Sequence, residues 1–309
     1  MVALGGNALI PPGGRGTAEE QTSTVAQAMA QVAPLVASGA ELVITHGNGP
    51  QVGNLLLKNE FAKELVPAMP LDWCVAQTQA TIGLAIQTAL EWELHHRAVN
   101  RRVVVVLTRV VVDPLDPARL RHSKPIGQSL SESEARARTD ESHRYSEQPG
   151  GGWRRVVPSP EPVAILEEGE IRHLLSTGAV VVAAGGGGVP VEAGEDGRYF
   201  GVEAVIDKDL TASLLARSLE AETLVILTGA AGAIINFGKP GQRLLQRVTP
   251  TIMRGIQAAG HFGDGSMGPK VEAALRFVEA GGSRAVIASL DDATQAIAGD
   301  KGTQIFGPR

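Results

Sequence analysis

The chain has 309 residues, of which 43% are hydrophobic, so it is long enough to bury one large core or two ordinary ones. Its formal charge of -5 argues against a nucleic-acid-binding protein, and no apolar run reaches the ~18 to 20 residues that a membrane span requires. The single cysteine, Cys74, excludes an internal disulfide, and the first residues lack the pattern of a signal peptide. We therefore expect a cytoplasmic protein with neither nucleic acid nor a membrane as its partner.

Short apolar runs rich in β-branched residues recur along the chain, and glycine or polar residues follow each of them. Their hydrophobicity is nearly continuous rather than alternating, which is typical of parallel strands covered by helices on both faces. We predict strands at Val2–Leu4, Leu42–Thr45, Val103–Val112, Val180–Ala184, Thr223–Thr228 and Ala285–Ala288.

Helical patterns lie between these runs. Thr17 and Glu20 have the spacing of a capping box, apolar residues recur at helical spacing from Val25 to Val36, and Gly39 stands where a left-handed cap would end the helix. The alternating order of strands and helices predicts an α/β protein with a doubly wound, mainly parallel sheet. Further helices are predicted at about 75–97, 161–177, 208–220 and 270–280.

Residues 113–157 interrupt this alternation. The stretch is rich in Pro, Ser, Glu, Arg and Gly and has little apolar periodicity. Long loops of this kind are either functional or disordered, so the segment is either a mobile surface insertion or a lid over an active site.

Four glycine clusters follow predicted strands. They are Gly5-Gly6-Asn7, Gly47-Asn48-Gly49-Pro50, Gly185 to Gly188 and Gly229 to Gly232. At the strand ends of an open α/β sheet, exposed backbone N–H groups can hold anions. One such cluster can be a simple tight turn, but four of them favour a binding face for more than one anionic group.

Lysines stand next to two predicted helix starts. The segment from Gly263 to Lys270 combines a glycine-containing loop with a lysine at a helix N-terminus, where the helix dipole disfavours a cation and an anionic ligand would compensate. It is not a P-loop, because Pro269 intervenes and no Ser or Thr follows the lysine. Lys208, within Asp207-Lys208-Asp209, has a similar position, while Lys124 in the insertion has the character of a solvated surface residue.

Other chemistries lack the residues they need. The first glycine cluster does not have the spacing of a dinucleotide fingerprint, and the histidines, His95 and His96 included, have no zinc-binding spacing. Asp264 replaces the first glycine that a serine nucleophile elbow needs around Ser266. Hydride transfer, zinc hydrolysis and serine hydrolysis are therefore disfavoured, and no metal site formed by protein side chains is expected.

Six segments, in order along nearly the whole chain, resemble the carbamate kinases of the amino-acid kinase family. They are Val2 to Leu9, Thr45 to Gly53, Lys124 to Gly127, Arg154 to Pro160, Gly201 to Asp209, and Gly265 to Val271.

This resemblance implies one amino-acid kinase domain over residues 1–309, a three-layer α/β/α sandwich with a mainly parallel central sheet. It implies a substrate lobe at about 1–180 that carries the lid at about 113–157, and a nucleotide lobe at about 181–309. The implied activity is reversible phosphoryl transfer between ATP and carbamate, with ATP/ADP and Mg²⁺ as cofactors, in arginine metabolism. Members of the family are commonly homodimers.

The resemblance also implies roles for individual residues. Other family members carry a lysine at the place of Ala3, whereas carbamate kinases supply one from the lid, here Lys124. The implied catalytic residues are Lys124, Lys208, Asp209 and Lys270. The implied substrate-binding residues are Gly5, Gly6, Asn7, Gly47, Asn48 and Gly49. The implied nucleotide-binding residues are Gly186, Gly187, Lys208, Thr228, Gly229, Met267 and Lys270.

One segment departs from the family pattern. Where relatives have a Thr-Asp-Val-Asp stretch, this chain has Thr228 followed by Gly229, Ala230, Ala231 and Gly232, so both acidic groups are missing. A binding homologue without catalysis, or one with altered specificity, is therefore the alternative to an active kinase.

Overall fold

The structure is a computed structural model that describes residues 1–6, 9–10, 14, 16–140, 143–148, 151–263 and 267–307. Its centre is an eight-stranded sheet with the strand order β15-β17-β16-β12-β1-β2-β9-β3. The six strands from β16 to β3 run parallel, and β17 and β15 run opposite to them. The strands are β1 (Val2–Leu4), β2 (Val43–His46), β3 (Val103–Val105), β9 (Val180–Val182), β12 (Thr223–Thr228), β15 (Arg247–Val248), β16 (Arg284–Ser289) and β17 (Thr303–Phe306).

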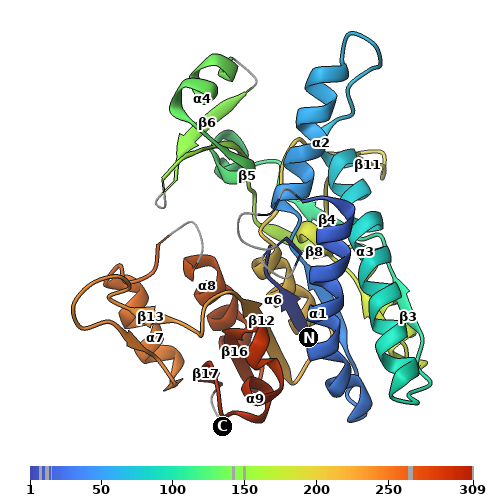
Figure 1. Cartoon of the computed structure of the whole chain (residues 1–309), viewed down its shortest axis with the longest axis vertical. Coiled ribbons are helices and arrows are strands. Elements are labelled where there is room, and N and C mark those ends of the chain that lie inside the picture. The colour runs from blue at the N-terminus through green and yellow to red at the C-terminus, as the bar shows by residue number, and fades with distance from the viewer. Residues whose placement is uncertain are drawn as a thin grey trace.

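Helices cover both faces of this sheet (Figure 1). On β1, Val2 and Leu4 pack into a core with the helices of one face, and Ala3 between them packs into the core of the other face. This alternation confirms the predicted α/β fold with a mainly parallel sheet between two helical layers. The first face carries α1 (Ala18–Ala37), α3 (Leu71–His96) and α9 (Ala293–Ala298), and the second carries α5 (Glu168–Ser176), α6 (Lys208–Ser218) and α8 (Met267–Glu279).

The prediction of one strand over Val103–Val112 is wrong. The segment forms β3 in the central sheet and, after a break, β4 (Arg109–Val112) in a second sheet of order β11-β10-β4-β8. The break lies at Thr108, whose backbone N–H and carbonyl bond to the side chain of Gln79 on α3, at 2.8 and 3.0 Å. The other strands of this sheet are β8 (Pro162–Ile165), β10 (Val189–Ala193) and β11 (Tyr199–Gly201).

The helix predicted at about 161–177 begins later than expected. Its first residues form β8, which pairs antiparallel with β4, so their apolar side chains serve a sheet and the helix α5 starts only at Glu168. In contrast, the capping box predicted for α1 is present, because Thr17 and Glu20 bond to each other's backbone N–H groups.

The insertion between β4 and β8 is folded rather than irregular. Strands β5 (His122–Leu130), β7 (Trp153–Pro158) and β6 (Arg144–Glu147) form an antiparallel sheet that carries helix α4 (Glu132–Arg138), preceded by the short turn η2 (Pro117–Leu120). We call the described residues of 122–158 the lid. In Figure 1 the lid, drawn in green, stands at one end of the molecule above the C-terminal helices.

Several further elements complete the fold, and the sequence analysis gave bounds for none of them. No helix among the described residues is long and apolar enough to cross a membrane. The remaining elements are α2 (Gly49–Ala62), α7 (Pro250–Ala258), β13 (Ile234–Ile235), β14 (Arg243–Leu244), η3 (Gly185–Gly187) and η4 (Leu290–Asp292).

Candidate active site

Parallel strands bring their carboxyl ends to one edge of a sheet, where ligands of open α/β folds bind. Strands β1, β2, β9 and β12 are parallel, so the glycines that follow them, Gly5, Gly47, Gly185 and Gly229, lie along that edge. A cavity of about 860 Å³ opens there and includes Gly6 and Gly47 in its lining. This volume falls in the range of small-molecule sites.

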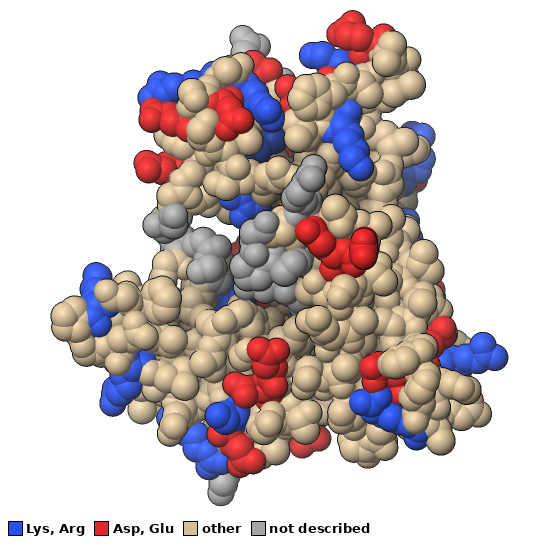
Figure 2. Space-filling view, in the orientation of Figure 1, with Lys and Arg blue, Asp and Glu red and all other residues tan. Residues whose placement is uncertain are grey.

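The walls of this cavity come from segments that are far apart in the sequence. Strand β5 supplies the residues from Lys124 to Ser129, and helices α2, α6 and α8 supply their first turns. Figure 2 shows the outline of the molecule hollowed between the lid and the C-terminal part, with acidic and basic side chains interspersed over the visible face. The cavity therefore lies between the lid, the sheet edge and α8.

Two lysines of the cavity share one aspartate. Lys208 and Asp209 open α6, and Lys270 lies in the first turn of α8. The Nζ of Lys208 donates to Asp209 Oδ1, and that of Lys270 donates to Asp209 Oδ2 at 3.0 Å. The Asp209 side chain is only 4% exposed. One carboxylate thus holds two ammonium groups at the same wall of the cavity.

Burial and charge shift the pKa values of these three groups. Burial alone would raise the pKa of Asp209, but the two ammonium groups hold it well below its ordinary range. Burial lowers the pKa of Lys208. Burial also opposes the charge on Lys270, yet the Asp209 carboxylate raises the pKa of this lysine above its ordinary value. Asp209 is therefore ionised at neutral pH and orients both lysines.

The lid contributes the third lysine. Lys124 lies on β5, and its Nζ pairs with Oδ2 of Asp207, the residue that caps α6. The side chain of Lys124 is 30% exposed, so it is more accessible than Lys208 or Lys270. The structure thus brings together in one cavity all four residues that the sequence analysis named as catalytic.

Three of the named substrate-binding residues after β2 line the same cavity, and so does Gly6 after β1. Asn48 is 3% exposed, and its Nδ2 donates to Thr78 Oγ1 at 2.9 Å, which fixes its side chain. Gly5 does not line the cavity: its N–H donates to the Leu227 carbonyl on β12. Asn7 lies outside the described residues.

The glycine turn after β9 has a packing role. A Cβ at Gly186 would lie 2.1 Å from Asn48 Nδ2, and one at Gly187 would lie 2.4 Å from the Ile206 carbonyl oxygen. Both residues have positive φ, which favours glycine. Gly186 lines the cavity and Gly187 does not. These glycines let the backbone approach the Asn48 side chain and the segment before α6.

The other residues named for nucleotide binding lie beside the cavity and are not part of its lining. Thr228 ends β12, Gly229 follows it as an exposed residue, and Met267 opens α8 with its side chain packed against the core. They lie at the same sheet edge as the lysines, because β12 is parallel to β1 and α8 packs beside β12.

Comparison with known proteins shows which family has this fold. Residues 1–289 match the amino acid kinase family. A carbamate kinase from Thermococcus kodakarensis is 47% identical over 309 residues, which cover 99% of this chain and 98% of that protein.

The chain belongs to the amino acid kinase family.

Solved structures of family members have the same fold. A carbamate kinase from Giardia lamblia bound to citric acid superposes with a TM-score of 0.95 at 37% identity, covering 99% of this chain and 97% of that one. The same Giardia lamblia enzyme bound to AMP-PNP superposes with a TM-score of 0.90 at 38% identity, covering 99% and 98% of the two chains.

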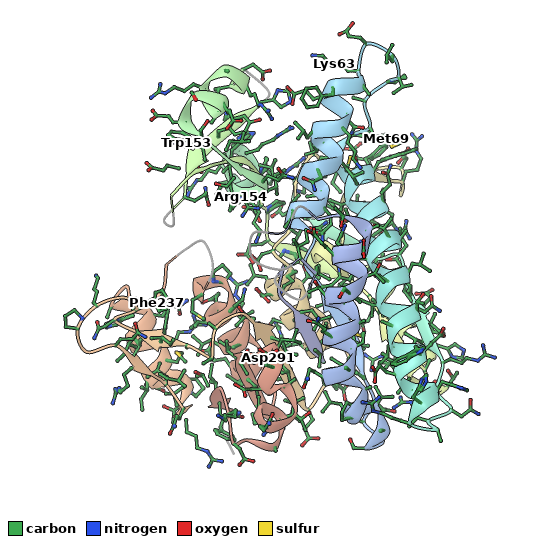
Figure 3. All side chains as sticks on the ribbon, viewed as in Figure 1. Lys63, Met69, Trp153, Arg154, Phe237 and Asp291 are labelled. Atoms are coloured by element: carbon green, nitrogen blue, oxygen red, sulfur yellow. The ribbon has the colours of Figure 1, made fainter. Side chains whose placement is uncertain are left out.

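Sequence reasoning missed two charged residues of this amino acid kinase site, Asp207 and Arg154. Arg154 on β7 lines the cavity, and its Nε and Nη2 donate to the Gly127 carbonyl at 3.0 and 2.6 Å. Figure 3 shows Arg154 at the base of the lid, where the lid meets the rest of the molecule. Both residues stand inside segments quoted for the family resemblance, but nothing in the local pattern shows that their side chains turn inward.

His46 lies under the site as a neutral side chain. It ends β2 and is 1% exposed, and its Nδ1–H donates to the Gly47 carbonyl at 2.9 Å. Burial lowers the pKa of His46 to about 4, the hydrogen bond to Gly47 opposes this shift, and the nearby Lys208 adds to it. An uncharged imidazole can therefore pack against the Gly185 turn without adding charge to the lysine cluster.

The described residues include no group of three or more His, Cys, Asp or Glu side chains that could hold a metal ion. The two aspartates of the cavity, Asp207 and Asp209, are already paired with lysines. These carboxylates therefore do not form a ligand set for a metal of their own.

Proposed function

We propose that the protein is a carbamate kinase that transfers a phosphoryl group between ATP and carbamate, and forms ATP and carbamate from ADP and carbamoyl phosphate. The observation that carries the proposal is the convergence of Lys124, Lys208 and Lys270 in one cavity at the strand ends. The curated relatives named carbamate kinase, which are 41–47% identical to this chain, support the choice of acceptor.

The chemistry of the reaction matches these residues. Carbamate is already an anion, so its oxygen attacks phosphorus without a general base to deprotonate it. The main barrier is the approach of this anion to a negatively charged phosphoryl group, and fixed positive charges lower that barrier. The three ammonium groups and the backbone N–H groups of the glycine segments can supply this charge.

The place of the lysines also favours carbamate over other acceptors of the family. Ala3, at the position where other family members carry a lysine, is fully buried in the core and brings no charge to the cavity. Lys124 reaches the cavity from the lid instead. This exchange of one lysine for another is the pattern that the resemblance associates with carbamate kinases.

The residues that line the cavity and those that lie beside it suggest where each substrate binds. We propose that carbamate lies against Gly6, Gly47, Asn48 and Gly49 in a substrate lobe of about 1–180, under the lid. We propose that the nucleotide lies against the C-terminal lobe of about 181–309, near Thr228, Gly229 and Met267. Mg²⁺ enters as part of the substrate, bound to the phosphates, since this ion keeps several waters and takes few protein ligands.

A coupled assay of ATP formation tests the proposal. Purified protein is mixed with ADP, carbamoyl phosphate and Mg²⁺, and ATP is followed with hexokinase and glucose-6-phosphate dehydrogenase. We expect turnover that requires all three reactants. A protein that is folded by circular dichroism but gives no ATP above the blank contradicts the proposal.

A second candidate function is nucleotide or carbamoyl phosphate binding without catalysis, or transfer to another acceptor. The absence of acidic residues in the segment from Gly229 to Gly232 favours it. Calorimetric titration with AMP-PNP separates the two, because tight binding without turnover supports the second candidate alone. Acetylglutamate, glutamate and aspartate, offered with ATP as alternative acceptors, test altered specificity.

The proposal extends to assembly and location. We propose a homodimer, as the resemblance implies, and the exposed side chains of Trp73, Leu84 and Trp92 along α3 offer an apolar surface for it. Light scattering at a series of concentrations tests this. We also propose a cytoplasmic location, which the buried free thiol of Cys74 supports, and a role in arginine metabolism, which rests on the resemblance.

A further inference from the structure

Asp207 uses both oxygens of its carboxylate. Oδ1 accepts the backbone N–H groups of Asp209 at 2.8 Å and Leu210 at 3.4 Å, and so caps helix α6. Oδ2 pairs with the ammonium group of Lys124, which belongs to the lid and lies 83 residues earlier in the chain. The side chain is only 10% exposed. One carboxylate therefore connects the lid to the first turn of α6.

We propose that Asp207 is a positioning residue for phosphoryl transfer, which holds the ammonium group of Lys124 at the reacting phosphoryl group by anchoring it to α6. This inference rests on the proposed function. The same helix turn carries Lys208 directly and holds Lys270 through Asp209. A single rigid element thereby sets the positions of all three lysines.

The lid lysine needs this anchor more than the other two do. Lys124 comes from a separate three-stranded sheet, and its side chain is about twice as exposed as that of Lys270. A lysine side chain has ~2 kcal/mol of rotamer entropy to lose when it is fixed. An aspartate that orders the side chain beforehand removes this cost from the transition state, where geometry decides the rate.

The charges indicate that Asp207 acts on geometry rather than on affinity. The cluster consists of three ammonium groups and two carboxylates, Asp207 and Asp209, which leaves one net positive charge. Each carboxylate weakens the attraction for an incoming phosphate. Removal of the charge on Asp207 should therefore strengthen or preserve binding of anionic substrates while it slows the chemical step. Loss of a helix cap alone would not produce this combination of unchanged binding and slower chemistry.

The test compares Asp207→Asn with Asp207→Ala in the ATP-formation assay. Asparagine can still accept the N–H groups of α6 through its side-chain oxygen but carries no charge for Lys124. We expect kcat to fall roughly tenfold or more in both variants, with KM for ADP and carbamoyl phosphate unchanged or lower. Only the alanine variant should also melt at a lower temperature. Wild-type kcat in Asp207→Asn overturns the inference.

The matched control is Asp116→Asn. Asp116 caps the turn η2 and also accepts the N–H of Glu161, but it does not line the cavity. We expect wild-type kcat and KM from this variant. The proposed function fails if the wild-type protein has no turnover, whereas the inference fails if the wild type turns over and Asp207→Asn matches it.

A double-variant cycle asks whether Asp207 acts through Lys124. In the Lys124→Ala background, measured by single turnover with enzyme in excess, Asp207→Asn should change the rate by less than about twofold. An equal loss in both backgrounds overturns the inference.

Hydrogen exchange provides a readout that needs no catalysis. Without ligand, Asp207→Asn should raise the exchange rate of the β5 amides of His122, Ser123, Lys124 and Ile126 by roughly fivefold, because the lid has lost its anchor to α6. The amides of α4, none of whose residues lines the cavity, should exchange at wild-type rates. Unchanged exchange in β5 overturns the inference even for a protein without turnover.

Discussion

Helix α2 and the lid meet at two glycines, and an alanine at one of them should disturb catalysis. A Cβ at Gly53 would lie 2.0 Å from the Cα of Gly127 and 2.2 Å from its nitrogen, whereas ordinary contacts begin at 3.4 Å. Both clashing atoms are backbone, so no rotamer change relieves them. Gly53→Ala therefore requires the lid turn and α2 to separate by about 1.4 Å.

This displacement should reach the lid lysine. Lys124 lies three residues before Gly127 on the same strand, and the residues from Lys124 to Ile126 between them are paired with β7, so a shift at Gly127 should move this paired segment. A misplacement of ~1 Å at a catalytic group can cost about 10²-fold in rate. We expect kcat for ATP formation to fall about 100-fold, and overpacking to lower the free energy of unfolding by ~1 to 3 kcal/mol.

The control is Gly169→Ala near the start of α5, where no atom lies within 4 Å of the added Cβ. It should leave kcat and stability nearly unchanged. Urea unfolding of both variants separates loss of folded protein from loss of rate. A Gly53→Ala enzyme that keeps kcat within about threefold of wild type would refute the argument that the glycine contact sets the lid position.

Three further predictions concern the charged groups. Lys124→Ala should lower kcat by several orders of magnitude without unfolding the protein, since the Lys124 side chain is 30% exposed. The control Lys58→Ala, on the exposed part of α2, should keep wild-type kinetics. Equal rates in the two variants would show that the lid lysine takes no part in the mechanism. Asp209→Asn leaves two buried ammonium groups without their carboxylate, so the free energy of unfolding should fall by ~3 to 5 kcal/mol at neutral pH. Because the pKa of Asp209 is depressed in the folded protein, this deficit should shrink as pH falls below about 4, and a deficit that is constant with pH would contradict the ion-pair explanation. Burial lowers the pKa of His46 to about 4, so only the unfolded chain binds this proton between pH 6.5 and 4, and stability should drop by up to ~3 kcal/mol as pH falls through that range. Urea titrations should show a smaller fall in the free energy of unfolding over this pH range for His46→Gln than for the wild type. An identical fall in the two proteins would mean that other groups cause it.

Local sequence patterns determined the central secondary structure because they report on burial and on caps. The strands at Val2–Leu4 and Thr223–Thr228 have the predicted bounds, and helix α1 begins at the predicted capping box. Continuous apolar runs correctly indicated a sheet covered on both faces. These features depend on neighbours within a few residues, which the sequence displays directly.

Contacts between distant segments overrode local pattern elsewhere. The pattern of Val103–Val112 predicts one strand, but the side chain of Gln79 on α3 hydrogen-bonds to both the N–H and the carbonyl of Thr108. The segment is therefore divided between two sheets. The lid has little apolar periodicity because its small sheet buries few side chains. The lid is folded because β5, β7 and β6 pair with one another, and this pairing cannot be predicted from the sequence of any one strand.

The residues of the candidate site divide in the same way. Glycines after strands, and lysines at the starts of α6 and α8, are visible as local motifs, so sequence alone predicted an anion-binding edge on an α/β sheet. Only tertiary structure decided which charges meet. Asp209 joins Lys208 to Lys270, 61 residues away, and Asp207 joins the lid to α6 across 83 residues. Such pairs form because the loops after parallel strands lie at one edge of the sheet and the lid folds over them. That geometry is a property of the assembled sheet rather than of any single segment.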